Sequence, residues 1–271
     1  MRIQSANLLT LDVESWYHAN YASTQKFPSP PTDPADRGVH RWIELLAEFR
    51  VESTCFVLGE FADRHPHLVR ALSEAGHEIG THMWSHDLCY EMSADQFRTS
   101  LHRSKSRLED LTGQPVRGLR CPSWSFNPER MPWFEDIVLA EGLAYDSSVF
   151  PFQTGMYGSS SFAGFKRGLR EVQPTVAKFG AWNWPITSGF FLRVLPTPVF
   201  RYVVRREWLS NRNTMIVLHP RELDPQHPRM RLRLDHSFIH YVGLRGVEAK
   251  LKWCLEQASW TSIRRHLDLK A

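Results

Sequence analysis

Long apolar runs are missing from this sequence of 271 residues, and none approaches the ~20 residues that a membrane-spanning helix needs. An integral membrane protein is therefore excluded. The first residues, MRIQSANLLTLDVE, also lack the charged segment, the long apolar stretch and the small-residue cleavage site of a secretory signal peptide. We therefore expect a cytoplasmic protein, with the inner face of the membrane as an alternative location.

Cysteine is scarce, and the four residues Cys55, Cys89, Cys121 and Cys254 form no CxxC pair. This spacing argues against a thiolate zinc site and, without a signal peptide, against a disulfide framework. A large charge excess is also missing, since 33 basic and 29 acidic residues leave a net charge of +4. Such a mild excess is compatible with an anionic substrate or peripheral membrane association, requires neither, and does not indicate nucleic-acid binding.

Strand-like and helix-like segments alternate over most of the chain. Strands are predicted at residues 7–13, 51–59, 77–82, 116–123, 143–151 and 214–220, and helices at residues 39–49, 67–75, 93–111, 132–141 and 201–209. This alternation predicts an α/β fold with a parallel sheet, closed or nearly closed into a (β/α) barrel. Residues 20–38 are predicted to be a loop, and residues 153–190 show few clear periodicities.

The tail after residue 220 differs from the rest. A Pro-rich segment is followed by a basic amphipathic helix whose apolar stripe contains Leu244, Val247, Leu251, Cys254, Leu255 and Ala258. We favour a helix packed on the barrel wall over a membrane-surface helix. The predicted organisation is one domain over residues 1–220 and a C-terminal extension over residues 221–271 that packs on it.

Charged and histidine side chains gather where predicted strands end, which is where parallel β/α folds carry their chemistry. These residues are Asp12, Glu14, His82, His86, Arg120, Asp146 and His219.

The pair His82 and His86 has the spacing that lets two imidazoles converge on one metal ion, although such a pair alone is often structural. Asp12 and Glu14 point to the same side of a strand, because the side-chain period of a strand is two. Two carboxylates on one face are costly unless a cation or a proton separates them. We favour a joint metal site over the alternative of a solvated strand end.

His219 ends the segment TMIVLHP and could donate a proton to a leaving group, or could be a satisfied core histidine. Arg120 could pair with a catalytic carboxylate, or be a surface cation. His236 and His240 repeat the same spacing in the tail, where we favour a structural role because no carboxylate accompanies them.

Five segments in order, LTLDVESWY, GTHMWSH, RCPSW, LAYDSSVFP and IVLHP, resemble the motifs of polysaccharide deacetylases of carbohydrate esterase family 4, which share the NodB-homology domain. The likeness is greatest to the bacterial branch associated with exopolysaccharide loci and exosortase systems. The resemblance implies a distorted (β/α) barrel with a C-terminal helical extension and one divalent metal ion, usually Zn²⁺, with Co²⁺, Ni²⁺ or Fe²⁺ as alternatives.

The resemblance also implies residue roles. His82 and His86 would be metal ligands, Asp12 the general base and His219 the general acid, while Arg120 would hold Asp12 and Asp146 would orient His219. The family commonly has two adjacent Asp residues in its first motif, whereas Val13 occupies the second position here. Glu14 is then the expected third ligand, with exchanged roles for Asp12 and Glu14 left open.

The expected activity is the metal-dependent removal of N-acetyl groups from an amino sugar in a polysaccharide, an oligosaccharide or a lipid-linked glycan precursor. Trp124, Tyr145 and Trp184 are candidates for the wall that contacts the sugar, with core packing an equal alternative for each. Three other functions stay open: hydrolysis of a cyclic amide or formyl group at the same site, a non-haem iron oxygenase, and a catalytically inactive sugar-binding domain.

Overall fold

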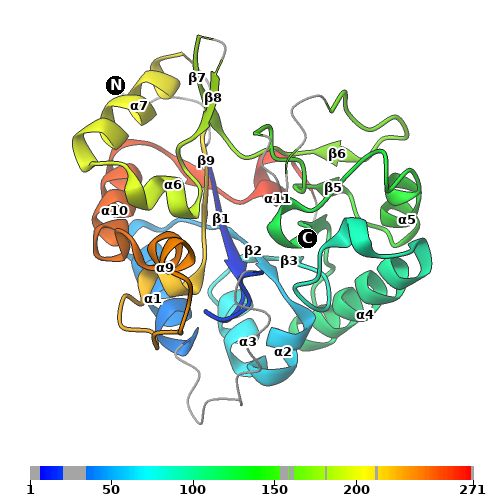
Figure 1. The fold of residues 1–271 in the computed structure, drawn as a ribbon. Coiled ribbons are helices and arrows are strands. Elements are labelled where there is room, and N and C mark those ends of the chain that lie inside the picture. Colours follow the sequence, from blue (N-terminus) through cyan, green and yellow to red (C-terminus); the bar gives the residue numbers. More distant parts are fainter. Residues whose placement is uncertain are drawn as a thin grey trace.

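The computed structural model describes residues 7–20, 35–152, 158, 162–180, 182–210 and 213–269. Its centre is a parallel sheet in the order β10-β1-β2-β3-β4-β5-β6, with β9 also paired to β1. These strands are β1 (Asn7–Val13), β2 (Thr54–Val57), β3 (Glu78–Thr81), β4 (Gly118–Leu119), β5 (Tyr145–Asp146), β6 (Arg170–Glu171), β9 (Met215–Leu218) and β10 (Trp260–Thr261). The sheet curls into a half-barrel with helices around its outside (Figure 1), which confirms the predicted fold class.

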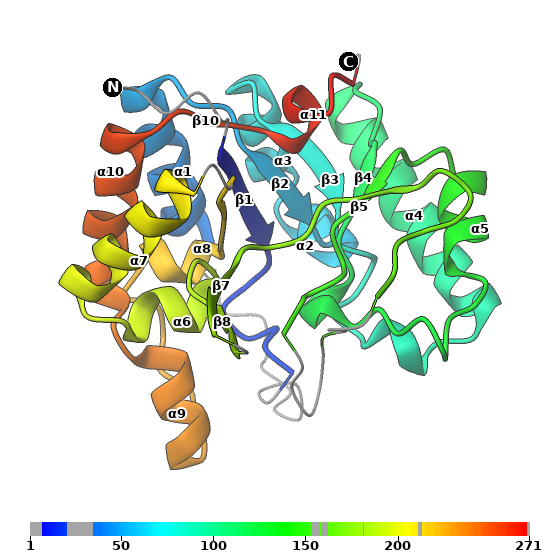
Figure 2. The same cartoon turned by 90° about the horizontal axis from the view of Figure 1, so that it is seen from above.

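Helices connect the strands and cover the outer wall of the half-barrel (Figure 2). They are α1 (Ala35–Phe49), α2 (Gly59–Arg64), α3 (Pro66–Glu74), α4 (Ala94–Thr112), α5 (Phe134–Ala140), α6 (Gly189–Val194), α7 (Thr197–Leu209), α8 (Pro220–Leu223), α9 (Leu234–Tyr241), α10 (Val247–Gln257) and α11 (Ile263–His266). A separate antiparallel hairpin joins β7 (Val176–Phe179) to β8 (Trp182–Pro185). Within the described ranges, no helix is both long and apolar enough to cross a bilayer.

Local sequence explains the longest helix. Ser93 caps the N-terminus of α4 by accepting a hydrogen bond from the Gln96 amide, and the Gln96 side chain accepts one from the Ser93 amide. This reciprocal capping box satisfies two backbone donors that a helix start would otherwise leave open. Gly113 ends the helix in the left-handed region at φ +66°, where a glycine carries no steric penalty. The predicted helix over residues 93–111 is thus confirmed to within one residue.

The strands at the far side of the sheet are shorter than predicted. Residues 116–123 and 143–151 contribute only two residues each to the sheet, as β4 and β5. Gly118 allows this pair to form because a Cβ atom at that position would lie 2.0 Å from the ring of Tyr145. The chain leaves the sheet directly afterwards, and this brings polar residues to the rim instead of extending the strands.

The C-terminal segment packs against the body of the protein. The predicted stripe is buried at Val247, Leu251, Cys254 and Leu255, and the ring of Trp253 stacks on Trp208 of α7 with centroids 5.6 Å apart. Strand β10 then enters the sheet beside β1. The stripe of α10 therefore faces the protein, as favoured from the sequence.

Two segments differ from the sequence predictions. Within the predicted loop over residues 20–38, helix α1 already begins at Ala35, and residues 21–34 lie outside the described part of the chain. The segment over residues 153–190, for which no elements were predicted, contains β6, β7 and β8 and the start of α6.

Candidate functional site

The carboxyl edge of the parallel sheet brings together the side chains predicted at strand ends. Asp12 and Glu14 lie at the end of β1, His82 directly follows β3, and His219 directly follows β9. Because all these strands run in the same direction, their carboxyl ends meet at one rim. Five of these residues line a single pocket of about 600 Å³, namely Asp12, Glu14, His82, His86 and His219.

Glu14, His82 and His86 form a cluster that could hold a metal ion. One ligand atom from each of these side chains lies within 4.8 Å of those of the other two. Nε2 of His86 is 2.9 Å from Oε2 of Glu14. Glu14 is buried, and its Oε2 accepts no hydrogen bond of normal geometry from any described residue. Two imidazoles and one carboxylate are donors that suit zinc and neighbouring divalent ions, so the residues present fit such an ion.

The backbone orients His82 within this cluster. Its Nδ1 lies 2.7 Å from the carbonyl oxygen of Arg120. A carbonyl can only accept, so Nδ1 carries the proton and the lone pair of Nε2 is left for a cation. Met83, the next residue, has φ +66°, an uncommon conformation for a residue with a side chain. This bend, rather than a helical turn, brings His86 back toward His82.

Protonation states favour cation binding. Burial lowers the pKa of His82 to about 4, so its ring is neutral at physiological pH. Burial opposes the ionised form of Glu14, but the neighbouring His86, His219 and His18 together hold its pKa well below the usual value. The cluster therefore presents one carboxylate and a neutral His82 imidazole as ligand groups.

Asp12 is paired with Arg120 instead of with the histidines. Nη1 of Arg120 donates to Oδ1 of Asp12 at 2.6 Å and to the Thr10 hydroxyl at 2.9 Å. Its Nη2 donates to the Ser147 hydroxyl at 2.9 Å, and the guanidinium lies over the ring of Phe56. Arg120 is fully buried. Its contacts therefore fix the orientation of the Asp12 carboxylate at the pocket wall.

His219 is oriented by Glu222, which the sequence analysis did not single out. Oε2 of Glu222 accepts from the His219 amide at 3.0 Å and lies 3.2 Å from Nδ1 of its ring. Nε2 of His219 points toward the cluster, 3.9 Å from Oε1 of Glu14. Arg193 donates from Nε to the other Glu222 oxygen at 3.0 Å.

His219 and Glu222 each stabilise the charged form of the other. Burial disfavours the charged form of His219, but Glu222 and, to a smaller extent, Glu14 together outweigh burial and raise the pKa of the imidazole. Burial likewise opposes ionisation of Glu222, yet His219 and Arg193 lower its pKa to about 2. The protonated form of His219 is thus favoured by the carboxylate of Glu222 beside it.

Asp146 does not occupy the position expected for it. The structure places it at the end of β5, where it accepts hydrogen bonds from the Ser148 amide at 3.0 Å and the Ser148 hydroxyl at 2.6 Å. Burial raises its pKa to about 6. The carboxylate beside His219 is Glu222, because β9 and α8 carry both of these residues on one short turn. The signal in the sequence was the three-residue spacing of a capping box.

The three aromatic candidates for the sugar wall have different environments. Trp124 lines the pocket and stacks on Phe150 with centroids 4.5 Å apart. Tyr145 is fully buried and donates to Oε1 of Glu78 at 2.8 Å, so its placement on the sugar wall was wrong. Its side chain points into the barrel, on the side of β5 opposite to Asp146. Trp184 is half exposed on the β7–β8 hairpin and is not among the described residues that line the pocket.

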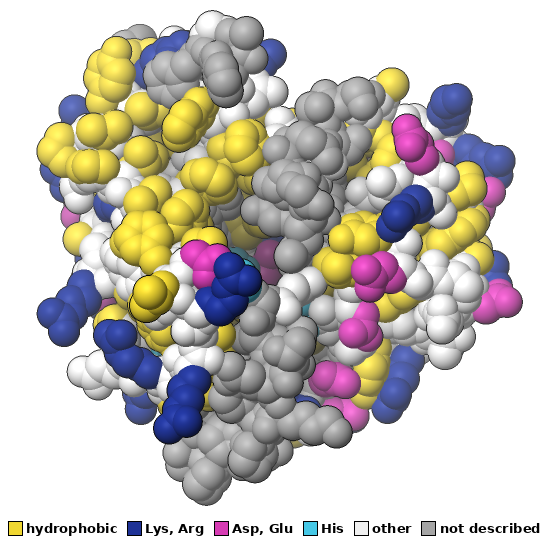
Figure 3. Space-filling model, viewed as in Figure 1, with side chains coloured by type: hydrophobic (Ala, Val, Ile, Leu, Met, Phe, Trp, Pro, Cys, Tyr) yellow, Lys and Arg dark blue, Asp and Glu magenta, His cyan; other side chains and the backbone are white. Residues whose placement is uncertain are grey.

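Apolar residues that sequence analysis missed complete the pocket. Phe190 and Phe191 of α6 and Ile239 of α9 line it, and His236, for which a structural role was favoured, lies beside them. His240 instead is buried against Arg221 and His227. Figure 3 looks onto this face, with histidine surface visible near its centre.

Comparisons with known proteins agree with this arrangement. Residues 32–132 match the family model described as polysaccharide deacetylase, and residues 147–268 match a domain of unknown function, DUF3473. A peptidoglycan deacetylase of Helicobacter pylori is 29% identical over 112 residues, which are 41% of this chain and 37% of that protein. A peptidoglycan-N-acetylglucosamine deacetylase of Bacillus cereus is 28% identical over 91 residues, 34% of this chain and 33% of that protein. The chain thus spans about a third of the length of these relatives.

Solved structures share the fold. A putative polysaccharide deacetylase from Mycobacterium smegmatis aligns over 98% of this chain and 93% of its own, with a TM-score of 0.61 and 18% identity. A pseudoenzyme of the CE4 family from Bacillus anthracis aligns over 99% of this chain and 67% of its own, with a TM-score of 0.55 and 16% identity. The curled parallel half-barrel is therefore the fold that this chain shares with these solved structures. Within that fold, residues 32–132 are similar to the polysaccharide deacetylase family.

Proposed function

We propose that the protein is a metal-dependent hydrolase that removes N-acetyl groups from an amino sugar in a polysaccharide, an oligosaccharide or a lipid-linked glycan precursor. The observation that carries the proposal is one pocket that is lined by the Glu14–His82–His86 cluster together with Asp12 and His219. The match of residues 32–132 to the polysaccharide deacetylase family model supports the same reaction class. Because the sequence resembles the branch associated with exopolysaccharide loci, we propose that the substrate belongs to exopolysaccharide biosynthesis.

A divalent ion would be held by Glu14, His82 and His86. Such an ion polarises a carbonyl oxygen and lowers the pKa of a coordinated water toward ~7. Zinc is the first choice for this ligand set, with Co²⁺, Ni²⁺ or Fe²⁺ as alternatives.

Asp12 is the proposed general base. Arg120 holds one of its oxygens at 2.6 Å, and the carboxylate lines the pocket beside the cluster. Asp12 would accept a proton from the attacking water as the water oxygen bonds to the acetyl carbon. The buried guanidinium keeps the carboxylate in place during this transfer.

His219 is the proposed general acid. Glu222 sets the orientation of its ring through Nδ1, so that Nε2 faces the pocket. His219 would protonate the sugar nitrogen as the amide C–N bond breaks, and acetate and the free amino sugar leave. The raised pKa of His219 favours the protonated ring that this step needs.

Glu14→Gln and Asp12→Asn separate the proposed ligand from the proposed base. Glu14→Gln is expected to weaken zinc binding by about 100-fold or more. Losing a group that only orients a metal ligand already lowers metal affinity by about 10–100-fold, and Glu14 is a proposed ligand itself. Asp12→Asn should bind zinc nearly as well as the wild type and lose most of its turnover. Zinc content after dialysis against a buffered competitor, measured by mass spectrometry, distinguishes the two.

The reverse result, with metal lost in Asp12→Asn and retained in Glu14→Gln, would exchange the two roles. Retention of both metal and full rate by both variants would contradict the proposed mechanism. Hydrolysis of cyclic amides or formyl groups, and sugar binding without turnover, are the outcomes left if acetylated glycans are not substrates. The parallel sheet and the match to the polysaccharide deacetylase model do not favour the iron oxygenase alternative.

A further inference from the structure

Exposed large hydrophobic side chains gather on one part of the molecule. All eight that the described chain exposes lie between residues 184 and 239, on β8, α6, α7 and α9. We call this set the apolar face: Trp184, Val194, Val199, Tyr202, Leu209, Leu234, Phe238 and Ile239. Figure 3 shows hydrophobic surface spread over α6, α7 and β8 in one half of the view, whereas acidic side chains gather in the other half. A large apolar patch at the surface is typical of a contact site.

Helix α9 is the most prominent part of this face. It projects from the body of the protein (Figure 2), and Leu234 and Phe238, one turn apart, are 91% and 55% exposed. The ring of Phe238 meets that of Phe190 on α6 with centroids 6.3 Å apart. The exposed side chains of α9 are therefore continuous with the apolar wall of the pocket.

A buried arginine fixes this projecting helix. The Nη atoms of Arg193 donate to the carbonyl oxygens of Ile239, His240 and Val242 at 2.8 to 3.0 Å, which satisfies acceptors at the C-terminal end of α9. Arg193 also holds Glu222, the partner of His219. The exposed apolar residues of α9 are thus presented by an anchored helix.

The segment that carries most of the apolar face is basic. Residues 193–245 contain ten arginines and four acidic residues, a net +6, although the whole chain has only +4. Three of these four acidic side chains are buried, Glu207, Glu222 and Asp224. The arginines on the surface are Arg201, Arg205, Arg229, Arg231, Arg233 and Arg245. The surface of this segment is therefore strongly cationic and matches an anionic partner.

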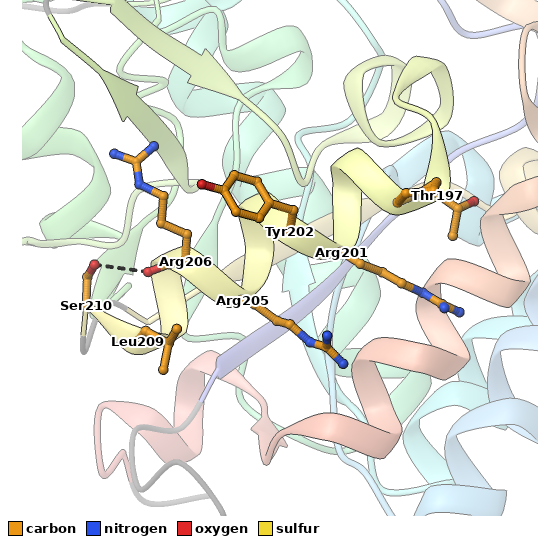
Figure 4. Close-up of a pocket in the computed structure, with 8 residues that line it drawn as sticks. Thr197, Arg201, Tyr202, Arg205, Arg206, Leu209 and Ser210 are labelled. Atoms are coloured by element: carbon orange, nitrogen blue, oxygen red, sulfur yellow. Dashed lines mark hydrogen bonds between the residues drawn. The ribbon is translucent and has the colours of Figure 1, made fainter.

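Helix α7 carries both basic and exposed apolar side chains around one hollow of about 680 Å³. Figure 4 shows Arg201 and Arg205 extending to one side of the helix and Tyr202 and Arg206 to the other. Tyr202 and Leu209 are 68% and 82% exposed, and the guanidinium groups of Arg201 and Arg205 lie over the ring of Trp253. Cationic groups beside exposed apolar side chains suit a lipid interface, where phosphates lie above acyl chains.

We propose that the apolar face docks on an anionic lipid bilayer. Five of its eight side chains are aliphatic and offer no ring on which a sugar could stack. A symmetric dimer through this face would bring its arginines close to those of the second copy, which is unfavourable. Because Ile239 of this face also lines the pocket, docking places the pocket beside the bilayer surface. The binding does not depend on catalysis, so its test is independent of the proposed reaction.

The test is co-sedimentation of the full chain with vesicles of equal parts phosphatidylglycerol and phosphatidylcholine, compared with vesicles of phosphatidylcholine alone. We expect binding to the anionic vesicles that weakens with added salt. The double substitution Leu234→Ser and Phe238→Ser should weaken it at least about tenfold, since two side chains lose their apolar contact with the acyl region. Arg233→Glu should weaken it by more than about fivefold, the factor that ~1 kcal/mol per basic residue represents.

Arg98→Glu on α4 is the matched control. Arg98 and Arg233 are both exposed and each pairs with a nearby aspartate, at 3.0 and 3.2 Å. Arg98→Glu should leave binding unchanged, and circular dichroism should show that all variants are folded. Equal binding to both kinds of vesicle, no binding at low salt, or unchanged binding by the Leu234/Phe238 variant would overturn the proposal. A dimer in solution that this variant dissolves would assign the face to a second copy and overturn it too.

Discussion

Replacing His219 by alanine is expected to lower the rate of deacetylation by about 10²- to 10⁴-fold, the range of general acid catalysis, with zinc content unchanged. The histidine lies 3.9 Å from Glu14 but outside the Glu14–His82–His86 cluster, so removing it takes away a proton donor and no ligand. Glu222 keeps its contact with Arg193 in this variant, which limits damage to the fold. Turnover of an N-acetylated oligosaccharide and metal analysis of the same sample measure the two effects.

Glu222→Gln provides the control for this assignment. Glu222 raises the pKa of His219, so the protonated ring is present below that raised pKa and is lost as the pH rises through it. Removing the negative charge should therefore move the alkaline limb of the rate profile to lower pH. A rate loss in Glu222→Gln with an unshifted profile, or a full rate in His219→Ala, is incompatible with His219 as the acid.

Replacing Arg120 by methionine is expected to lower the free energy of unfolding by about 3–5 kcal/mol. The substitution removes the cation that faces the buried Asp12 carboxylate and also the donors to Thr10 and Ser147. A buried carboxylate without its partner lowers the free energy of unfolding by more than the intact ion pair raises it. Chemical denaturation followed by circular dichroism gives the difference in unfolding free energy directly.

The double variant Arg120→Met with Asp12→Asn tests the cause of this loss. If the unpaired carboxylate is responsible, neutralising it should restore part of the stability, and the two substitutions will not be additive. Arg98→Met, at an exposed ion pair on α4, should change stability by about 0–1 kcal/mol. A cost of similar size at both arginines would show that the buried Arg120–Asp12 pair has no special role.

The sequence predicted the rim of the sheet because short apolar strands end abruptly at polar residues. Asp12 lies one residue before the end of β1, and His82 and His219 directly follow buried strands. Their meeting at one edge is therefore a consequence of parallel pairing alone. Glu14 was expected as the third ligand only through the family resemblance and the Val13 departure, because alternation places Asp12 and Glu14 on the same side of β1 and does not choose between them. In the structure, the buried Arg120 donates a hydrogen bond to Asp12, and this contact gives Asp12 and Glu14 different environments.

Long-range contacts account for what sequence reasoning missed. Tyr145 lies on a two-residue strand, too short for periodicity to reveal which side faces the barrel interior. Helix α9 has a weak apolar pattern, because its C-terminal end is held by Arg193 from α6 instead of by a buried stripe of its own. Hairpin β7–β8 contains Asn183 and Pro185, which are uncommon in strands.

The predicted division at residue 220 and the cytoplasmic location stay predictions. The DUF3473 model spans residues 147–268 and so crosses that boundary. Strand β9, before the boundary, and strand β10, after it, both pair with β1. Both sides of the boundary thus contribute to one sheet.

Acetate release by the zinc-loaded protein, set against His82→Ala, tests the central claim most directly. The substrates are N-acetylated monosaccharides, oligosaccharides and lipid-linked glycans. His82 is chosen because its Nδ1 contacts the Arg120 carbonyl oxygen, which leaves Nε2 as the atom that would bind the ion. The alanine variant lacks that atom. The account predicts acetate release from at least one substrate by the wild type, and neither release nor bound zinc in the variant. Equal release by both proteins, or none by a wild type that holds zinc, would contradict it.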